Sequence, residues 1–368
     1  HFVREERKPL LVCAKTVLIG HHTSGVRREF YRDKADLAKH SAKDPGIILK
    51  KYLLEEGFSE ETLSQIEIEA RKQIEEDFNK AILAPDPKPE TVKEHVYAPT
   101  PITEEKGNRV PENGEKIPMV DAGIHAIQEL MHKHPEALLY GQDVGGRIGG
   151  VFREVVTLQQ KFGNKRVFNT AIQEAYIIGS TVGMSAVGLK PIVEVQFADY
   201  IYPGINQLVT EVSKSCYLSN GKYPVSSIIR VPIGAYGGGG PYHSRSVETM
   251  LAQIKGIKIA YPSNAADFKG LFKAAFYDPN PVIFLEHKGL YWSKVPGTED
   301  AKTVEPAEDY ILPFGKANIV KFANEEEIQK GRTLVVVTYG MGVYWAKEAA
   351  KNFEGRVEII DLRTIKPI

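Results

Sequence analysis

The sequence predicts an α/β fold: a three-layer αβα arrangement around a mainly parallel sheet, with a helical segment before it and a second, partial α/β unit after it. From residue 120 on, apolar runs of strand length alternate with helical patterns, as in parallel sheets with helical crossovers. Most of these runs lack polar alternation, which is typical of strands covered on both faces. Before residue 117, a charged helical pattern leads into a proline-rich stretch.

Composition limits the function classes. The 368 residues suffice for two or three domains, and 47 lysine plus arginine balance 47 aspartate plus glutamate, so no net charge recruits nucleic acid or an anionic membrane. Cys13 and Cys216 are too few for a disulfide framework, which suggests a reducing compartment. No apolar run approaches the ~20 residues that span a bilayer, and the first residues have no signal-peptide pattern. We therefore expect a cytoplasmic protein that binds neither nucleic acid nor membrane.

The first residues resemble the end of a domain. The apolar run 9–19 predicts a strand within a few residues of the start, so we expect part of the natural domain to lie upstream. A polar, glycine-bounded loop follows at 20–32 and contains His21 and His22. Histidines in such a loop suit either acid/base chemistry or simple exposure to solvent.

A helical pattern covers residues 44–84. Apolar residues recur there at spacings of three and four, Ser59 suits an N-cap, and the opposite face is charged. Seven prolines then punctuate the polar segment 85–118. We predict a first part at 1–94 and a linker at 95–117.

The next part, 118–298, is predicted as the main α/β domain. Its strands are expected at 137–140, 166–172, 191–197, 225–232, 257–261 and 281–285, and its helices at 120–132, 205–217 and 265–277. The last part, 308–368, predicts strands at 316–322, 333–338 and 356–362 and a helix at 343–353. Three strands make a small domain, so we expect this part to be incomplete.

Glu174 occupies the junction of a strand and a nearly uncharged helix, in Arg166-Val-Phe-Asn-Thr-Ala-Ile-Gln-Glu174. Ligands of open α/β sheets bind at the carboxyl ends of strands. The alternative is a first-turn glutamate favoured by the helix dipole. A second candidate is His243, flanked by hydroxyls and Arg245, and suited to moving protons near an anionic substrate. The run Gly237–Gly240 suits a turn better than a phosphate cradle, because no lysine with serine or threonine follows it.

Several motifs together resemble one family. They are Gly141-Gln-Asp-Val-Gly, Gly150-Val-Phe-Arg, Arg166 to Ala175, Gln196-Phe-Ala-Asp-Tyr-Ile-Tyr-Pro, Tyr242-His-Ser-Arg-Ser and Leu285-Glu-His-Lys-Gly-Leu-Tyr. The chain from 118 on is similar to the β half of the thiamine-diphosphate-dependent decarboxylating component of 2-oxo acid dehydrogenase complexes. Gly20-His-His-Thr-Ser and the helical pattern resemble the end of its α half. The resemblance covers nearly the whole chain, in the order of an α–β fusion, and implies a transketolase-like pyrimidine-binding domain.

The resemblance also implies the site. Glu174 matches the glutamate that contacts the pyrimidine ring of the cofactor and thereby helps it to lose a proton. Ile172, Gln196, Tyr200 and Gln142 match the surroundings of that ring. His22 and His243 match histidines near the substrate and the incoming lipoyl group, where a proton must be delivered.

The sequence departs from the family at several positions. Gln142 stands where a glutamate is usual, and Leu18 where an arginine is frequent. The Gly-Asp-Gly motif that holds the diphosphate through magnesium is absent, so we expect that site in an upstream part and an inactive fragment without it. Asp278 and Asn280 resemble a loop that coordinates potassium in relatives, although a turn explains Asp-Pro-Asn equally well.

The resemblance favours oxidative decarboxylation of a 2-oxo acid, of the branched-chain type rather than pyruvate, with acyl transfer to a lipoyl-bearing acyltransferase. It also implies a homo-oligomer. Two alternatives remain: a transketolase-like C–C transferase such as a deoxyxylulose-phosphate synthase, and a non-catalytic subunit-docking module. The first shares the pyrimidine-domain architecture, and a carboxylate at Glu174 argues against the second.

Overall fold

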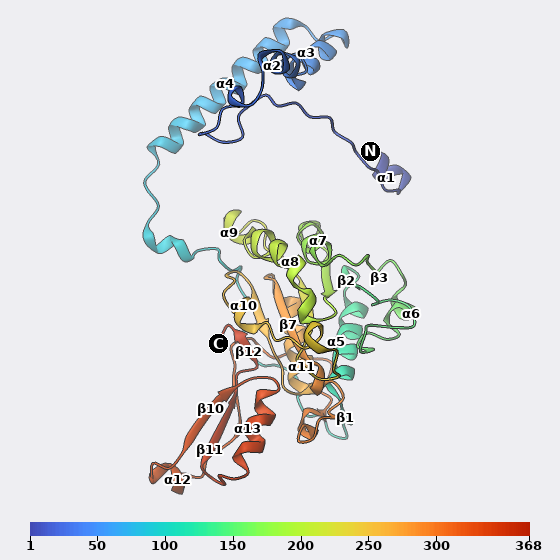
Figure 1. The fold of residues 1–368 in the computed structure, drawn as a ribbon, viewed down its shortest axis with the longest axis vertical. Coiled ribbons are helices and arrows are strands. Elements are labelled where there is room, and N and C mark those ends of the chain that lie inside the picture. The colour runs from blue at the N-terminus through green and yellow to red at the C-terminus, as the bar shows by residue number, and fades with distance from the viewer. The chain divides into compact units, whose positions relative to one another are not determined.

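The computed structural model describes all residues from 1 to 368, and the chain divides into two compact units, 1–88 and 89–368. Figure 1 shows the elements of both. No helix of the chain is both long and apolar enough to cross a membrane.

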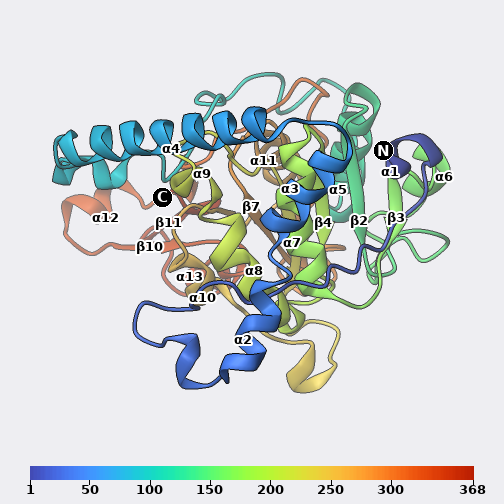
Figure 2. The same cartoon turned by 90° about the horizontal axis from the view of Figure 1, so that it is seen from above.

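The first unit is helical. Its helices are α1 (Phe2–Glu6), α2 (Lys34–Ser41), α3 (Pro45–Glu55) and α4 (Glu60–Leu83). The longest is α4, seen from the side in Figure 2. Ser59 caps it as predicted, because its Oγ accepts a hydrogen bond from the Thr62 amide at 3.0 Å. The helical pattern at 44–84 is thus confirmed, with a break at Gly57, whose φ is 94°.

The strand predicted at 9–19 is wrong. These residues form neither strand nor helix, and Leu10, Leu11 and Val12 are exposed. A strand needs a neighbour that takes its backbone hydrogen bonds. No strand exists in residues 1–88, so the apolar run has nothing to pair with.

A seven-stranded sheet forms the centre of the second unit. Its strands are β2 (Ala137–Gly141), β3 (Val167–Asn169), β4 (Lys190–Glu194), β5 (Ile228–Ile233), β6 (Lys258–Ala260), β7 (Val282–His287) and β12 (Thr364–Lys366). Their order is β12-β6-β7-β5-β4-β2-β3, and all neighbours are parallel except β12, which runs antiparallel to β6. The predicted mainly parallel sheet is confirmed.

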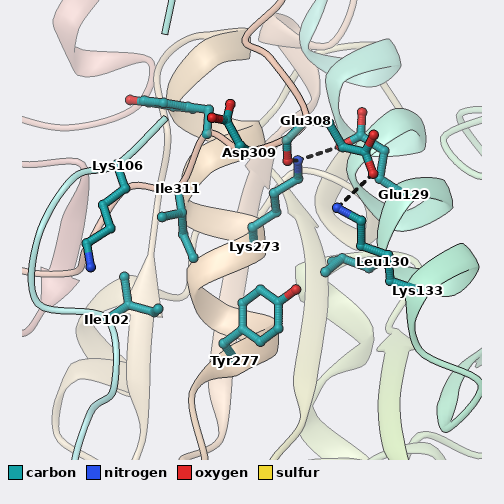
Figure 3. Close-up of a pocket in the computed structure, with 11 residues that line it drawn as sticks. Ile102, Lys106, Glu129, Leu130, Lys133, Lys273, Tyr277, Glu308, Asp309 and Ile311 are labelled. Carbon is teal, nitrogen blue, oxygen red and sulfur yellow. Dashed lines mark hydrogen bonds and ion pairs between the residues drawn. The ribbon is translucent and has the colours of Figure 1, made fainter. Parts of the chain in front are cut away.

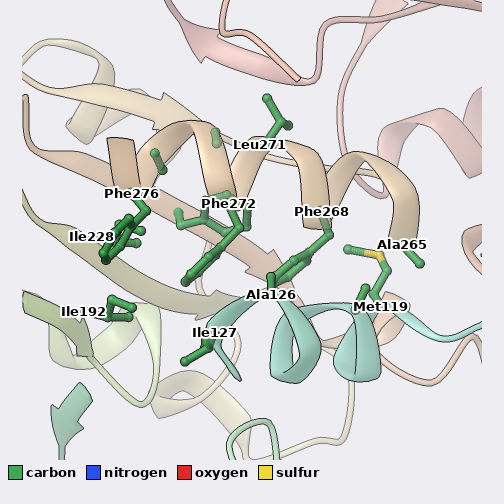
Figure 4. Packing of buried hydrophobic residues seen from close by; sticks show 14 of the residues in the cluster. Met119, Ala126, Ile127, Ile192, Ile228, Ala265, Phe268, Leu271, Phe272 and Phe276 are labelled. Atoms are coloured by element: carbon green, nitrogen blue, oxygen red, sulfur yellow. The ribbon is translucent and has the colours of Figure 1, made fainter. Parts of the chain in front are cut away.

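Helices cover both faces of this sheet. On one face, α5 (Met119–Lys133) and α11 (Ala265–Tyr277) bury a core in which Phe268, Phe272 and Phe276 line α11 (Figure 4). On the other face, α7 (Glu174–Ala186), α8 (Tyr202–Gln207) and α10 (Glu248–Ala252) pack over a second cluster. Close approach of α5 to α11 requires Gly123, because a Cβ there would lie 2.9 Å from the Phe268 ring. Helices on both faces of the sheet give the predicted three-layer αβα arrangement.

The remaining elements are short or peripheral. They are β1 (Lys116–Ile117), α6 (Leu158–Phe162), α9 (Ser215–Leu218), β8 (Thr303–Val304), β9 (Asn318–Lys321), α12 (Glu325–Gln329), β10 (Leu334–Thr338), α13 (Gly342–Ala350) and β11 (Val357–Asp361). The strands β10, β11 and β9 form a separate sheet, and α13 packs on it. The helix predicted at 205–217 is broken, because a π-helical turn at Leu208–Val212 separates α8 from α9.

The proline-rich segment is held on the second unit. Tyr97 donates its hydroxyl to the Ile257 carbonyl at 3.1 Å, and Arg109 pairs with Asp267 at 2.6 Å. The division between the two units falls after residue 88, whereas the sequence places the end of the first part at 94. These contacts tie residues that were expected to be a linker to α11 and to the residue before β6.

Candidate active site

Four predicted site residues follow the carboxyl ends of parallel strands. Gln142 follows β2, Gln196 lies two residues after β4, and His243 lies in the loop after β5. Glu174 begins α7, five residues after β3. Because parallel strands end at one edge, the topology gathers these side chains at the edge where α/β folds bind ligands.

Glu174 is buried at this edge, with 8% of its surface exposed. Gln142 donates its Nε2 to Oε1 of Glu174 at 3.0 Å. No other side chain donates to this carboxylate, which leaves Oε2 free for a ligand. The position at the first turn of α7 also favours a negative charge, because unpaired amides point out of the helix there.

A second amide fixes the loop that carries Gln142. Gln196 donates its Nε2 to Oδ2 of Asp143 at 2.9 Å and to the Gln142 carbonyl at 3.3 Å. Two neutral amides therefore hold the surroundings of Glu174. The departure at Gln142 has a structural meaning, since a glutamate there would place two carboxyls about 3.0 Å apart, competing for one proton.

His243 and Tyr200 form the second group. The Tyr200 hydroxyl lies 2.8 Å from Nε2 of His243, and Nδ1 lies 3.0 Å from the Gly239 carbonyl. In a neutral imidazole, an Nδ1–H that donates to this carbonyl leaves Nε2 to accept from Tyr200. Phe197 connects the two groups, because its ring contacts both aromatic rings and its neighbour Gln196 belongs to the first.

A cavity of about 200 Å³ opens beside His243. It is lined by Phe152, Phe197, Tyr236, Gly237, Gly238, Gly239, His243 and Lys288. Burial lowers the pKa of Lys288, whose ammonium lies 5.0 Å from the centre of the Phe197 ring and donates to the His243 carbonyl. The sequence reasoning did not single out Lys288, although it lies in the quoted motif that begins at Leu285. The cavity thus combines a histidine with a cation and suits an anionic substrate.

A buried ionic cluster supports this edge and was also missed. Arg230 contacts Glu286 through Nε at 2.7 Å and Glu194 through Nη1 at 3.0 Å. Glu154 accepts from the Phe152 amide at 2.7 Å, and burial raises its pKa to about 7. Burial likewise raises the pKa of Glu194 well above its usual range. Glu194 and Glu286 share this guanidinium, whereas Glu154 is buried nearby without an ion pair, so burial favours its protonated form.

Two predicted residues have no partner within these groups. Ile172 is 84% exposed in the loop before α7. His22 lies in the first unit, on an exposed loop, and makes no side-chain hydrogen bond; the neighbouring His21 accepts from the Arg28 amide at 3.1 Å. The chain contains no group of three or more histidine, cysteine, aspartate or glutamate residues arranged to hold a metal ion.

A separate cavity of about 340 Å³ lies between α5, α11 and residues 102–106 and 308–311 (Figure 3). Its charged residues neutralise one another, because Lys273 pairs with Glu129 at 2.5 Å and Lys133 with Glu308 at 2.8 Å. None of the predicted site residues lines it. We therefore place the candidate site at the carboxyl edge.

Comparison with protein families gives two matches. The transketolase pyrimidine-binding domain matches residues 115–293, and the dehydrogenase E1 component matches residues 1–90. Among solved structures, a chain described as split gene transketolase, inactive beta4 tetramer, aligns with a TM-score of 0.52 at 20% identity, over 68% of this chain and 72% of that one. At this identity the likeness shows the fold.

Curated relatives are more similar in sequence. The 2-oxoisovalerate dehydrogenase subunit beta of Bacillus subtilis is 38% identical over 252 residues, 68% of this chain and 72% of the relative. The corresponding subunit of Pseudomonas aeruginosa is 40% identical, over 68% and 71%. The pyruvate dehydrogenase E1 component subunit beta of Acholeplasma laidlawii is 40% identical, over 68% and 73%. With an E1-type segment before the pyrimidine-binding domain, this chain belongs to the family of 2-oxo acid dehydrogenase E1 components and carries its β-type part.

Proposed function

We propose that this chain takes part in the oxidative decarboxylation of a 2-oxo acid, with reductive transfer of the acyl group to a lipoyl group. The names of its relatives support a 2-oxo acid dehydrogenase, and those of Bacillus subtilis and Pseudomonas aeruginosa support the branched-chain type. The observation that carries the proposal is the buried carboxylate of Glu174, held through one oxygen by Gln142 at the carboxyl edge of the sheet.

The residues fit the pyrimidine end of thiamine diphosphate. A carboxylate with one free oxygen suits a ring nitrogen that carries a proton, and the exposed side chain of Ile172 offers an apolar contact for the ring. When bound, the cofactor supplies the electron sink that decarboxylation of a 2-oxo acid needs. Oε2 of Glu174 would accept the hydrogen bond of that ring nitrogen, while Gln142 orients the carboxylate and Gln196 fixes the backbone of Gln142.

His243 is proposed to deliver the proton that the lipoyl group requires. The hydrogen bond between the Tyr200 hydroxyl and Nε2 of His243 fixes the orientation of the imidazole, and Lys288 fixes the backbone of His243 and adds positive charge beside the cavity. A lipoyl arm and the carboxylate of a 2-oxo acid would both reach this cavity. His22 is proposed to contribute from the α-type part.

The rest of the assembly is proposed from the family. We propose a magnesium site for the diphosphate in an α-type part, a lipoyl-bearing acyltransferase as the partner, and association with further copies. The relatives are named as subunits, which supports assembly with other chains. A cytoplasmic location is proposed as well, although the relatives of Dictyostelium discoideum and Arabidopsis thaliana are named as mitochondrial.

The test replaces the carboxylate in the complete enzyme. Glu174→Gln keeps the size of the side chain but cannot hold a negative charge, and we expect it to lower kcat by about 100-fold or more. The measurement is 2-oxo-acid-dependent reduction of ferricyanide with thiamine diphosphate and magnesium. The exposed Glu354→Gln serves as control and should retain full activity. Undiminished turnover by Glu174→Gln would refute the proposal and favour a docking module.

The same assay separates the other enzyme class. A transketolase-like C–C transferase consumes sugar phosphates, whereas a 2-oxo acid dehydrogenase reduces ferricyanide without them. We expect turnover with branched-chain 2-oxo acids alone. Turnover that depends on a sugar phosphate acceptor would reassign the chain.

A further inference from the structure

The end of α11 opposite the active site concentrates negative charge inside the second unit. Asp278 is the C-cap of this 13-residue helix and is only 1% exposed. The last carbonyls of a helix have no partner within it and carry its partial negative charge. The carboxylate of Asp278 adds a full charge at the same place. Such a site needs a buried cation.

Lys190 supplies one positive charge there. This residue begins β4, and its Nζ donates to the Phe276 carbonyl at 3.1 Å and to the Ser226 hydroxyl at 2.9 Å. Ser226 in turn donates to the Asp278 carbonyl at 2.9 Å. Nζ also lies 5.5 Å from the centre of the Phe276 ring. Because Lys190 is 86 residues from Phe276 in the chain, its ammonium ties the start of β4 to the end of α11.

Lys258 supplies a second positive charge. This residue begins β6, and its side chain is only 6% exposed. Its Nζ lies 2.5 Å from Oδ2 of Asp278 and also donates to the Thr100 hydroxyl. The other carboxylate oxygen of Asp278 accepts from the amide and the side chain of Asn280, at 2.9 and 2.7 Å. Every side-chain oxygen of Asp278 is therefore bound by this chain.

The side chain of Asn280 is engaged as well. Its Oδ1 accepts from the Ala98 amide at 2.7 Å, and its Nδ2 donates to the Ala98 carbonyl at 2.9 Å. The resemblance described above implies potassium at Asp278 and Asn280, and potassium binds where several oxygens replace its water shell. The oxygens are present here, yet two ammonium groups, three amide groups and the Ser226 hydroxyl already bind them. The donor set does not fit an additional ion.

We propose that the ammonium groups of Lys190 and Lys258 take the place of a monovalent cation at the C-terminal end of α11, so that the turn 276–280 is ordered without potassium. An ammonium resembles a potassium ion in charge and in its preference for oxygen, and a lysine carries it on a chain long enough to reach a buried carbonyl. Attachment to the chain also means that no ion has to be bound from solution.

Thermal unfolding of the complete chain tests this inference without any measurement of activity. We expect the Tm in potassium chloride and in choline chloride of equal ionic strength to agree within about 1 °C, because choline is too large for the site and no ion is needed. A Tm that is several degrees higher in potassium than in choline would overturn the proposal. Loss of the proposed enzymatic function would leave this outcome unchanged.

A variant sharpens the test. In choline chloride, Lys190→Ala should lower the Tm by about 5 °C, and amide exchange in a peptide covering 273–281 should become about 10-fold faster. Potassium should restore at least about half of both losses, because it enters the vacated oxygen site. The exposed Lys222→Ala is the control and should respond to neither salt.

Two results with the variant would contradict the proposal. One is a Lys190→Ala protein with unchanged Tm and unchanged exchange at 273–281. The other is a Lys190→Ala protein whose Tm and exchange rate are the same in potassium chloride as in choline chloride, which would show that no potassium ion enters the vacated position. Should Lys190→Ala fail to fold, the comparison of the two salts on the unaltered chain still decides.

Discussion

The two edges of the seven-stranded sheet use charge in opposite ways. At the amino edge, Lys190 and Lys258 and the groups they contact bind one another completely. At the carboxyl edge, acids outnumber their partners: Glu174 has one side-chain donor, and Glu154 and Glu194 each keep an oxygen without a hydrogen bond. Balanced charge stabilises the fold. Carboxyl groups that lack partners, and are held in place by the sheet, can instead bind a ligand or a proton.

The largest expected effect is the loss of the one cation in the buried cluster at the carboxyl edge. Arg230→Met leaves Glu194 and Glu286 buried without a cation, although the Tyr291 hydroxyl still donates to Glu286, and the free energy of unfolding should fall by about 3–5 kcal/mol. Denaturant unfolding measures it, and the exposed Arg147→Met is the matched control. Equal stability of the two variants would mean that Glu194 and Glu286 are already neutral. The carboxyl edge would then hold no more unbalanced charge than the amino edge.

A smaller effect concerns pH. The pKa of Glu154 is about 7 in the folded chain, above its usual 4.5. Between these values the unfolded chain loses a proton that the folded chain keeps, so stability falls as pH rises from about 4.5 to 7. Glu154→Gln should remove about 1–3 kcal/mol of this fall, because an amide has no proton to lose between these pH values. Denaturant unfolding at several pH values checks it, and an unchanged slope for the variant would contradict the assignment.

The smallest expected effect is at the cavity. Tyr200→Phe removes the hydroxyl that contacts Nε2 of His243, and we expect kcat for acyl transfer to the lipoyl group to fall about 10-fold, since the imidazole loses its orientation. Ferricyanide-coupled decarboxylation should fall less, because Glu174 is untouched. The nearby, exposed Tyr242→Phe is the control. Equal losses in both assays would assign Tyr200 to the pyrimidine pocket instead.

Much of the sheet could be predicted from local sequence. The apolar runs of β2, β4, β5 and β7 are long and bounded by turns, so their burial follows from composition. The run at 9–19 has the same composition and forms no strand, because a strand depends on a neighbour that the run itself does not specify. For the same reason the three residues of β12 were missed, since they pair with β6 more than 100 residues earlier.

The residues of the candidate site also fall into those that the sequence could identify and those that it could not. Glu174, Gln142, Gln196, Tyr200 and His243 could be named from motifs, and the structure brings them into two hydrogen-bonded groups. Lys288 and Glu154 were missed, because their importance comes from burial beside residues far away in the sequence. The roles of the named residues in catalysis stay predictions until the variants are measured.

The strand β12 has a consequence for solubility. An open sheet exposes two rows of unpaired backbone groups, which invite pairing with other molecules. Here the antiparallel β12 covers the β6 side, and the opposite end is β3, which is only three residues long. Neither end offers a long, flat template for another strand. The segment that forms β12 protects one end against aggregation, and the shortness of β3 protects the other.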